Sequence, residues 1–451
     1  MRLVATHFAV VTLMKAIISR LRSPTVGSVT TGLASQTALL VSGPLLARML
    51  GLDGRGYLAA LVLWPALIAQ LGSMGMPLAV TYFTAQRRIS VRSITRAALS
   101  FAIPQTLLLT ALHGAVLLLV LRGESSSVRM AGAVTLAAVP ASLVQQYGLA
   151  MLQGRQRFVA FNVLRLLPVI LYAGGVATLF VFGVTTILPV AVVLVGANAS
   201  IGAATLVMGL WSSENAGTAG GSADLREMLR FGLRGFLGSI SPIENLRVDQ
   251  MVVLIFLAPA ALGVYVVGLA FTNLPRFVAQ SVGMVAYPTV AGCTDEKAAR
   301  RSMWAFLWAS AAMSVVIVMP LLLAAGWIVP FFFGAEFRDA VRVTQILLPG
   351  AVFVAARRVL SDGLRGRGHP TAGTLAEVAA WLWLAPALAV AVPLWGASGV
   401  AGAVSTSYAF SFGTLLIITA MLGEMRQGQV LLISPRVAWH RLRFPATVRE
   451  S

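Results

Sequence analysis

Long apolar stretches separated by short polar connections dominate this chain. An α-helix needs roughly 20 residues to cross a hydrocarbon core of about 30 Å, and each of these stretches is long enough. The pattern predicts twelve membrane-spanning helices. They cover residues 27–48, 57–84, 97–121, 129–151, 160–182, 186–210, 231–256, 262–287, 303–328, 340–361, 372–394 and 397–422.

The longest connection between spans, residues 211–230, lies between the sixth and seventh spans and has the Gly, Ala and Ser content of a flexible linker. It separates an N-lobe, residues 25–210, from a C-lobe, residues 231–422. Residues 1–24 contain an apolar run too short to span, for which a cytoplasmic or interfacial helix and a disordered leader are alternatives. Residues 423–451 form a basic tail.

Short motifs recur in the two lobes at an offset close to 210 residues. The pairs are Leu50–Leu58 with Leu257–Val266, Gly154-Arg155 with Gly366-Arg367, and Arg122–Arg129 with Ala335–Arg342. They predict a duplicated six-helix unit. Because six is even, both copies would insert with the same orientation, about an axis along the membrane normal.

Composition agrees with a polytopic all-α membrane protein. The 451 residues are 58% hydrophobic and 11% charged, whereas soluble proteins have about 25% charged residues. The net charge of +19 comes from small clusters between spans. About 25 cations fall on one side of the membrane and about six on the other, which places both termini in the cytoplasm. These clusters suit membrane lipid headgroups, and the charge requires no nucleic-acid partner.

Catalytic and metal-binding patterns are absent from the sequence. It has one cysteine, Cys293, and four scattered histidines, so no metal site is predicted. No phosphate-binding G-x-x-x-x-G-K-[ST] motif occurs. No predicted external loop is long enough to carry an active site. We therefore expect a protein that is not an enzyme, with a membrane glycosyltransferase or polymerase as the less favoured alternative.

Polar residues interrupt the seventh and eighth spans. A charge at membrane depth costs about 2.5–3.5 kcal/mol on insertion scales and usually faces a partner or a wet cavity. These residues are Glu244, Asn245, Arg247, Asp249, Asn273 and Arg276. They predict a lining for the path of a polar or anionic substrate. Two structural alternatives stay open, an i,i+3 pair of Glu244 with Arg247 and a pair of Arg276 with Asp249.

Three further charged residues lie within or at the ends of other spans. Arg48 ends the first span, and Arg165 in the fifth either faces the cavity or reaches back to the interface. Glu377 in the eleventh span could titrate during transport, or pair with Arg365 or Arg367. Asp249 lies deeper and is the first candidate for coupling to an ion, a proton or sodium; Glu244 and Glu377 are the others.

Several degenerate motifs, taken in order, carry a family resemblance. They are Ala47–Gly51 with Gly56-Tyr57, Arg247–Asp249, Leu262–Tyr265 with Pro275, Phe333–Phe337, and Gly366–Gly368. Over residues 25–422 the chain resembles the Wzx-type oligosaccharide flippases of the multidrug/oligosaccharidyl-lipid/polysaccharide (MOP) exporter superfamily. The resemblance implies two six-helix bundles in a V shape, alternating access, and movement of an undecaprenyl-pyrophosphate-linked oligosaccharide across the cytoplasmic membrane.

The resulting hypothesis is a lipid-linked oligosaccharide flippase without a cofactor, with polysaccharide assembly proteins as possible partners. Its substrate-binding cavity would be lined by Arg247, Arg276, Arg48, Arg165, Asn245 and Asn273. Three rivals remain: a cation-coupled multidrug or metabolite antiporter of the same fold, the membrane enzyme named above, and a non-transporting scaffold.

Overall fold

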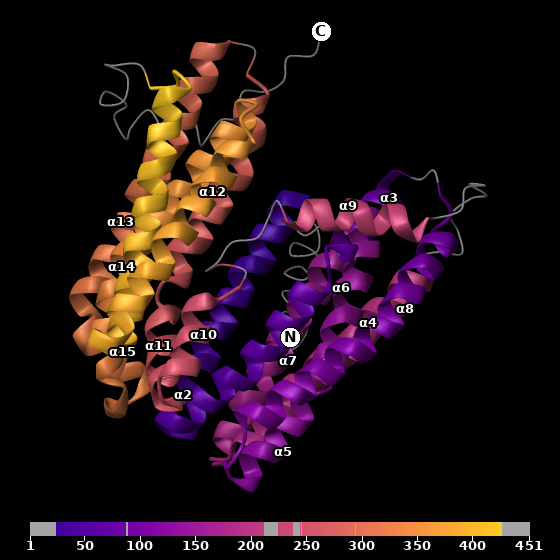
Figure 1. The fold of residues 1–451 in the computed structure, drawn as a ribbon, viewed down its shortest axis with the longest axis vertical. Coiled ribbons are helices and arrows are strands. Elements are labelled where there is room, and N and C mark those ends of the chain that lie inside the picture. Colours follow the sequence, from indigo (N-terminus) through magenta and orange to yellow (C-terminus); the bar gives the residue numbers. More distant parts are fainter. Residues whose placement is uncertain are drawn as a thin grey trace, which may run out of the picture. The chain divides into compact units, whose positions relative to one another are not determined.

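The computed structural model describes residues 24–86, 89–211, 224–237, 244, 246–293 and 295–425. The predictions for residues 1–23, for most of the linker and for the tail beyond residue 425 lie outside these ranges. The chain forms two compact units, Met1–Ile240 and Ser241–Ser451. Helices make up almost all of the described structure, which confirms the predicted all-α fold class (Figure 1).

The first unit contains eight helices in its described part. They are α2 (Pro24–Gly72), α3 (Met76–Gln86), α4 (Val91–Val120), α5 (Ser126–Thr135), α6 (Ala138–Gly154), α7 (Phe158–Val181), α8 (Ile187–Trp211) and α9 (Leu225–Leu237).

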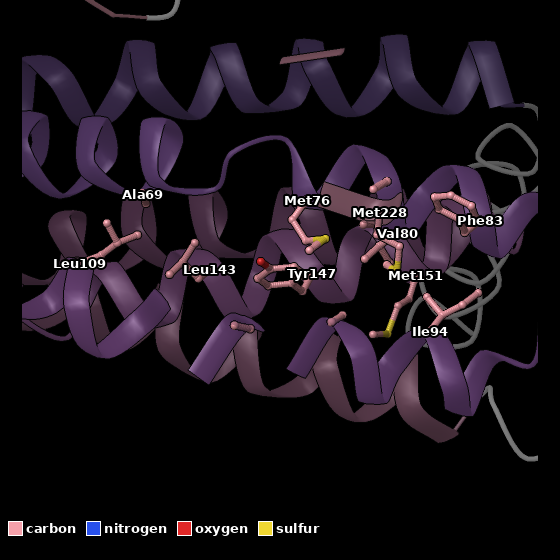
Figure 2. Close-up of a cluster of buried hydrophobic side chains, with 14 of the residues drawn as sticks. Ala69, Met76, Val80, Phe83, Ile94, Leu109, Leu143, Tyr147, Met151 and Met228 are labelled. Atoms are coloured by element: carbon pink, nitrogen blue, oxygen red, sulfur yellow. The ribbon is translucent and has the colours of Figure 1, made fainter. Parts of the chain in front are cut away.

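A buried cluster joins five of these helices (Figure 2). Met76 and Val80 of α3 meet Leu143 and Met151 of α6, and Met228 of α9 reaches the same cluster. Residues from α2 and α4 complete it. In this way residues far apart in the sequence form one apolar core, and α9 is part of it.

Helix α2 contains the first predicted span and the beginning of the second. Its 49 residues would extend about 74 Å if straight, far more than the roughly 30 Å of a hydrocarbon core. Gly51, with φ of 66° and ψ of −171°, breaks the helical backbone between them. Only glycine adopts such a conformation without strain from a Cβ atom.

The predicted second span is wrong in one respect, because it is not continuous. The chain turns at residues 73–75, where Met74 and Gly75 have positive φ angles. Gln105 of α4 donates a 2.6 Å hydrogen bond to the Gly72 carbonyl, and Tyr147 donates to Gln105 at 2.8 Å. These side chains satisfy a helix-end carbonyl that lipid could not.

The predicted seventh span is also wrong. Residues 225–237 form α9, an amphipathic helix that packs on α3 within the first unit (Figure 1). Gly232 lies so close to the turn at Gly75 that a Cβ on Gly232 would be 2.7 Å from the Gly75 carbonyl oxygen. The apolar face of α9 therefore docks on protein, and the next helix in the described part of the chain begins at Val248.

The second unit contains the remaining described helices. They are α10 (Val248–Phe256), α11 (Pro259–Ala270), α12 (Asn273–Ala291), α13 (Glu296–Phe333), the short 3-10 helix η1 (Ala335–Phe337), α14 (Asp339–Gly366) and α15 (Thr371–Met421). The predicted eighth span corresponds to α11 and α12, which meet at a bend of 46°.

Helix α15 is a hairpin of the two last predicted spans. The helical backbone breaks at Gly396, where φ is 52°. Ser411 donates to the Ala376 carbonyl at 2.7 Å, and Ser407 donates to the Ala380 carbonyl at 3.1 Å. Along the chain, the residue number in the second half rises from 407 to 411 while that of its partner in the first half falls from 380 to 376, so the two halves of α15 lie antiparallel.

Eight described helices are long and apolar enough to cross a membrane, or nine if the bent pair α11–α12 counts as one span. Of the eight, α15 includes the last two predicted spans to within one residue, and α2 includes the first predicted span and residues 57–72 of the second. The motif pair at residues 154–155 and 366–367 ends α6 and α14 in the same conformation. The φ and ψ angles are −85° and 1° at Arg155 and −84° and 0° at Arg367, as a duplication requires.

Candidate functional site

Charged and phenolic side chains gather inside the second unit, in what we call the polar cluster. It draws on α10, α11, α12, α14, α15 and the segment before α10. Its members are Glu244, Asp249, Tyr265, Arg276, Arg357, Glu377 and Tyr408. The sequence analysis had singled out Glu244, Asp249, Arg276 and Glu377, and the structure brings all four into this cluster.

Asp249 lies in the first turn of α10 and is 1% exposed. Tyr265 of α11 donates a 2.7 Å hydrogen bond to its Oδ2 atom. The other carboxyl oxygen, Oδ1, is buried and accepts no hydrogen bond of standard geometry from the described residues, although the backbone N–H of Gln250 also acts on the carboxyl group. The N-terminal end of α10 supplies a favourable dipole for the negative charge. The carboxyl group is thus oriented while one oxygen stays available.

Arg276 projects from the first turn of α12 and has a neutral hydrogen-bond partner. Its Nη2 atom donates to the Tyr408 hydroxyl at 2.6 Å, and the guanidinium carbon lies 5.5 Å from the centre of the same ring. Its Nε atom is buried without a partner in the described part of the chain. Asp249 and Glu244 act on this charge electrostatically, yet no described carboxylate forms an ion pair with it.

Arg357 of α14, which is 6% exposed, is the third residue around which the polar cluster is arranged, after Asp249 and Arg276. It forms a short charged hydrogen bond with Glu377 and an ion pair of 3.9 Å with Glu244. Arg358 approaches Glu244 at 3.7 Å. Two carboxylates of the cluster are therefore neutralised by α14.

These pairs correct two alternatives of the sequence analysis. Glu244 does not pair with Arg247, because the two residues precede α10 instead of sharing a helix. Glu377 pairs with neither Arg365 nor Arg367; its partner is Arg357. An isolated i,i+3 argument holds only where both residues are helical.

Sequence reasoning missed Arg357, Tyr265 and Tyr408. Arg357 is one of the roughly 25 cations that the orientation argument assigns to the cytoplasmic side, so the sequence analysis assigned it no site role. Gly350, Val354 and Arg357 follow one another at intervals of four and three residues, which places Arg357 on the buried face of α14. This helical periodicity was the sequence signal that could have identified it. Tyr265 ends the Leu262–Tyr265 motif of the family resemblance but received no site role, and no local pattern marked Tyr408.

The remaining predicted site residues are not members of the polar cluster, although Arg247 acts electrostatically on Asp249. Arg247 is the N-cap of α10 and has a left-handed backbone, with φ of 47°. Asn273 opens α12 and is half-buried, and Asn245 lies outside the described residues. Arg48 and Arg165 belong to the first unit, and both are exposed. Arg165 donates to the Thr31 hydroxyl at 3.1 Å.

A second ionic group fixes the end of α15. Glu424 is 3% exposed and accepts hydrogen bonds from Arg300 at 3.1 Å and from Arg367 at 2.8 and 3.0 Å. Trp304 donates to the Glu424 carbonyl at 3.2 Å. Burial has the largest single effect and would raise the pKa of Glu424, but the hydrogen bonds and the positive charges of Arg367 and Arg300 together outweigh it and lower the pKa. This group links the ends of α13, α14 and α15.

The comparisons with known proteins agree with this fold. A family model described as "Polysaccharide biosynthesis protein" matches residues 45–342. No protein in a search of curated proteins matches. Among solved structures, the lipid II flippase MurJ in an inward closed conformation is 14% identical with a TM-score of 0.67, covering 87% of this chain and 88% of its own.

Two MATE transporters are also similar. An inward-facing MATE family transporter of the MOP superfamily is 14% identical with a TM-score of 0.67, over 86% of this chain and 94% of its own. A Vibrio cholerae MATE transporter, VcmN, is 12% identical with a TM-score of 0.60, over 92% and 99%. At these identities the likeness establishes the fold, which is the predicted two-lobe MOP fold.

Proposed function

The chain belongs to the polysaccharide biosynthesis protein family, and from that premise we propose that it is a transporter of a lipid-linked oligosaccharide. The substrate would carry a pyrophosphate on a polyprenol such as undecaprenol, and the protein would move it from the inner to the outer leaflet. The proposed setting is the cytoplasmic membrane, with both termini in the cytoplasm and with polysaccharide assembly proteins as partners.

Arg276 is the observation that carries the proposal. Its hydrogen-bond partner is a tyrosine hydroxyl, and its buried Nε–H has no partner among the described residues. A guanidinium group has five donors in a planar fork that matches phosphate oxygens. Because Tyr408 restrains the group without neutralising it, the positive charge remains available to a pyrophosphate.

Asp249 supports coupling of this transport to an ion. A buried carboxyl group with one oxygen unused is suited to bind a proton or a small cation, and intramembrane carboxylates often serve in such relays. Tyr265 would hold the carboxyl group in place during the exchange. The carboxylate of Asp249 also interacts electrostatically with the oppositely charged Arg276. Ion binding at Asp249 would therefore change how strongly Arg276 attracts an anion.

The second candidate is a cation-coupled antiporter of drugs or metabolites. The observation that favours it is the presence of three carboxylates, Glu244, Asp249 and Glu377, in the same cluster. Two of them are already paired with Arg357. A cationic substrate would therefore have Asp249 as its main partner, whereas an anionic substrate would have Arg276.

The test is transport of a fluorescent polyprenyl-pyrophosphate oligosaccharide in proteoliposomes that contain wild-type protein or Arg276→Gln. We expect at least a tenfold loss of rate in this variant, since a charge-assisted bond to phosphate contributes about 1.5–3 kcal/mol. Arg338→Gln, which removes an exposed arginine of the same unit, is the control and should transport normally. Equal rates for all three proteins would contradict the proposal, and uptake of cationic dyes that depends on Asp249 would favour the antiporter.

A further inference from the structure

A groove of about 410 Å³ lies in the second unit between α14 and both halves of α15. Its volume is in the range of ligand pockets. Small and aliphatic residues form most of the lining, including Val390 of the first half of α15 and Gly402 of the second. Arg342, in the first turn of α14, and Trp395, just before the hairpin turn, also line it.

Ser398 and Thr406 carry the only hydroxyl groups among the described residues that line the groove, so its interior offers little to a polar ligand. The Thr406 hydroxyl that lines it donates to the Gly402 carbonyl at 2.9 Å and accepts from Trp383 at 3.1 Å, so its hydrogen-bonding capacity is used within the unit. Val390 is 60% exposed and Trp395 is 58% exposed. Gly402 leaves open space, because a Cβ placed there would have no atom within 4 Å. These lining residues are suited to contact with a hydrocarbon chain.

One end of the groove has the opposite character. Arg342 is the single charged side chain among the described residues that line it. Asp339 lies three residues earlier on α14, yet Arg342 forms no ion pair with it or with any other described carboxylate. Trp395 marks the same end, and indole rings favour the interface between headgroups and hydrocarbon. From Gly396 to Thr406 the second half of α15 extends about 15 Å, a distance suited to part of an acyl chain.

We infer that this groove binds an anionic phospholipid, with an acyl chain between α14 and α15 and the phosphate on Arg342. Moving an acyl chain from bulk lipid into an apolar groove gains little, because lipid tails are as apolar as the protein surface. Selection must therefore come from the headgroup. A guanidinium group pairs with phosphate through two parallel hydrogen bonds, and with no competing carboxylate among the described residues Arg342 favours a lipid of net negative charge. This site is separate from the polar cluster.

The experiment is native mass spectrometry of the full-length protein, released from micelles that contain equal amounts of phosphatidylglycerol and phosphatidylcholine. We expect wild-type protein to retain phosphatidylglycerol preferentially. Arg342→Ala should reduce that preference about fivefold, the usual effect of one cation on anionic lipid binding. The matched control is Arg338→Ala, which removes an exposed arginine that does not line the groove.

Gly402→Leu tests the tail position, because Gly402 lines the groove and a Cβ placed there would have no atom within 4 Å, so a larger side chain can occupy the space of the acyl chain. Gly413→Leu is its control: Gly413 is also helical and lies on the same half of α15, and a Cβ placed there would likewise have no atom within 4 Å. Only Gly402→Leu should lose the retained lipid. Equal phosphatidylglycerol preference in wild type, Arg342→Ala and Arg338→Ala would overturn the inference, as would equal lipid retention by the two leucine variants. If Gly402→Leu fails to fold, the two arginine variants decide the question alone.

Discussion

The ion pair between Arg357 and Glu377 gives the sharpest test of the polar cluster. Arg357 has a side-chain exposure of 7% and Glu377 of 20%, so both charges are largely removed from solvent. Removing one member of a buried pair leaves the other charge uncompensated, at a cost of about 3–5 kcal/mol, whereas replacing both with apolar residues is often nearly neutral. Glu377 is partly exposed, which favours the lower end of that range.

The perturbation is therefore a double-mutant cycle of Arg357→Met, Glu377→Met and the double variant. We expect each single variant to lower the free energy of unfolding by about 3 kcal/mol, and the double variant to lose less than the sum of the two by at least 2 kcal/mol. For a unit of about 200 residues, a loss of 3 kcal/mol corresponds to a fall in melting temperature of roughly 6–12 °C. Thermal unfolding in detergent measures these differences.

Arg358→Met is the control for this cycle. Arg358 is the neighbouring residue on α14, but its side chain is 40% exposed and its ion pair with Glu244 is 3.7 Å long. A partly exposed pair contributes about 1 kcal/mol or less. If the two single changes at 357 and 377 are additive, or if Arg358→Met is as destabilising as Arg357→Met, the reasoning about burial is refuted.

Three further predictions concern the rest of the chain. Because the pKa of Glu424 is lowered in the folded protein, the stabilisation by its carboxylate is fully present above the ordinary pKa of about 4.5 and is lost as the pH falls through the lower, folded-state pKa. The difference in melting temperature between wild type and Glu424→Gln should therefore be constant from pH 8 to 6 and vanish in stronger acid. Gly232→Leu should detach α9 from α3, because the new Cβ would lie 2.7 Å from a backbone carbonyl oxygen. Hydrogen exchange in α9 should then become faster. Gly235→Ala should have a smaller effect, because its Cβ would meet only a leucine side chain. Gly396→Ala should cost about 1–2 kcal/mol of stability because φ is 52° there, whereas Gly413→Ala, at an ordinary helical position, should be neutral or stabilising in the same melting assay.

Much of the fold could be predicted because lipid constrains each span separately. The length and apolarity of residues 97–121 and 160–182 predicted the helices α4 and α7, whose observed bounds are Val91–Val120 and Phe158–Val181. The motif at residues 154–155 and its copy at residues 366–367 predicted two equivalent helix ends. Each of these features depends on a short stretch of chain and on its solvent.

The candidate site was only partly predictable. The sequence marked Asp249 and Arg276 because a charge in an apolar span is costly and needs a compensating reason. It could not show that Tyr408, 132 residues away, is the hydrogen-bond partner of Arg276. It also favoured local partners for Glu377, when the true partner is Arg357. Partners on different helices depend on packing, which leaves no trace in the spacing of either residue.

The sequence by itself determined that the chain spans a membrane, where most of its helices begin and end, and which buried charges require an explanation. Hydrophobicity and helix length are properties of individual segments, so they can be read without knowing the neighbours. Only the tertiary structure decided that the apolar face of α9 is buried on α3, that the chain turns at Gly75, and that Arg357 joins two carboxylates. Those outcomes follow from the shapes of facing surfaces and from the need to pair buried polar groups, which is satisfied by residues brought together from distant parts of the chain.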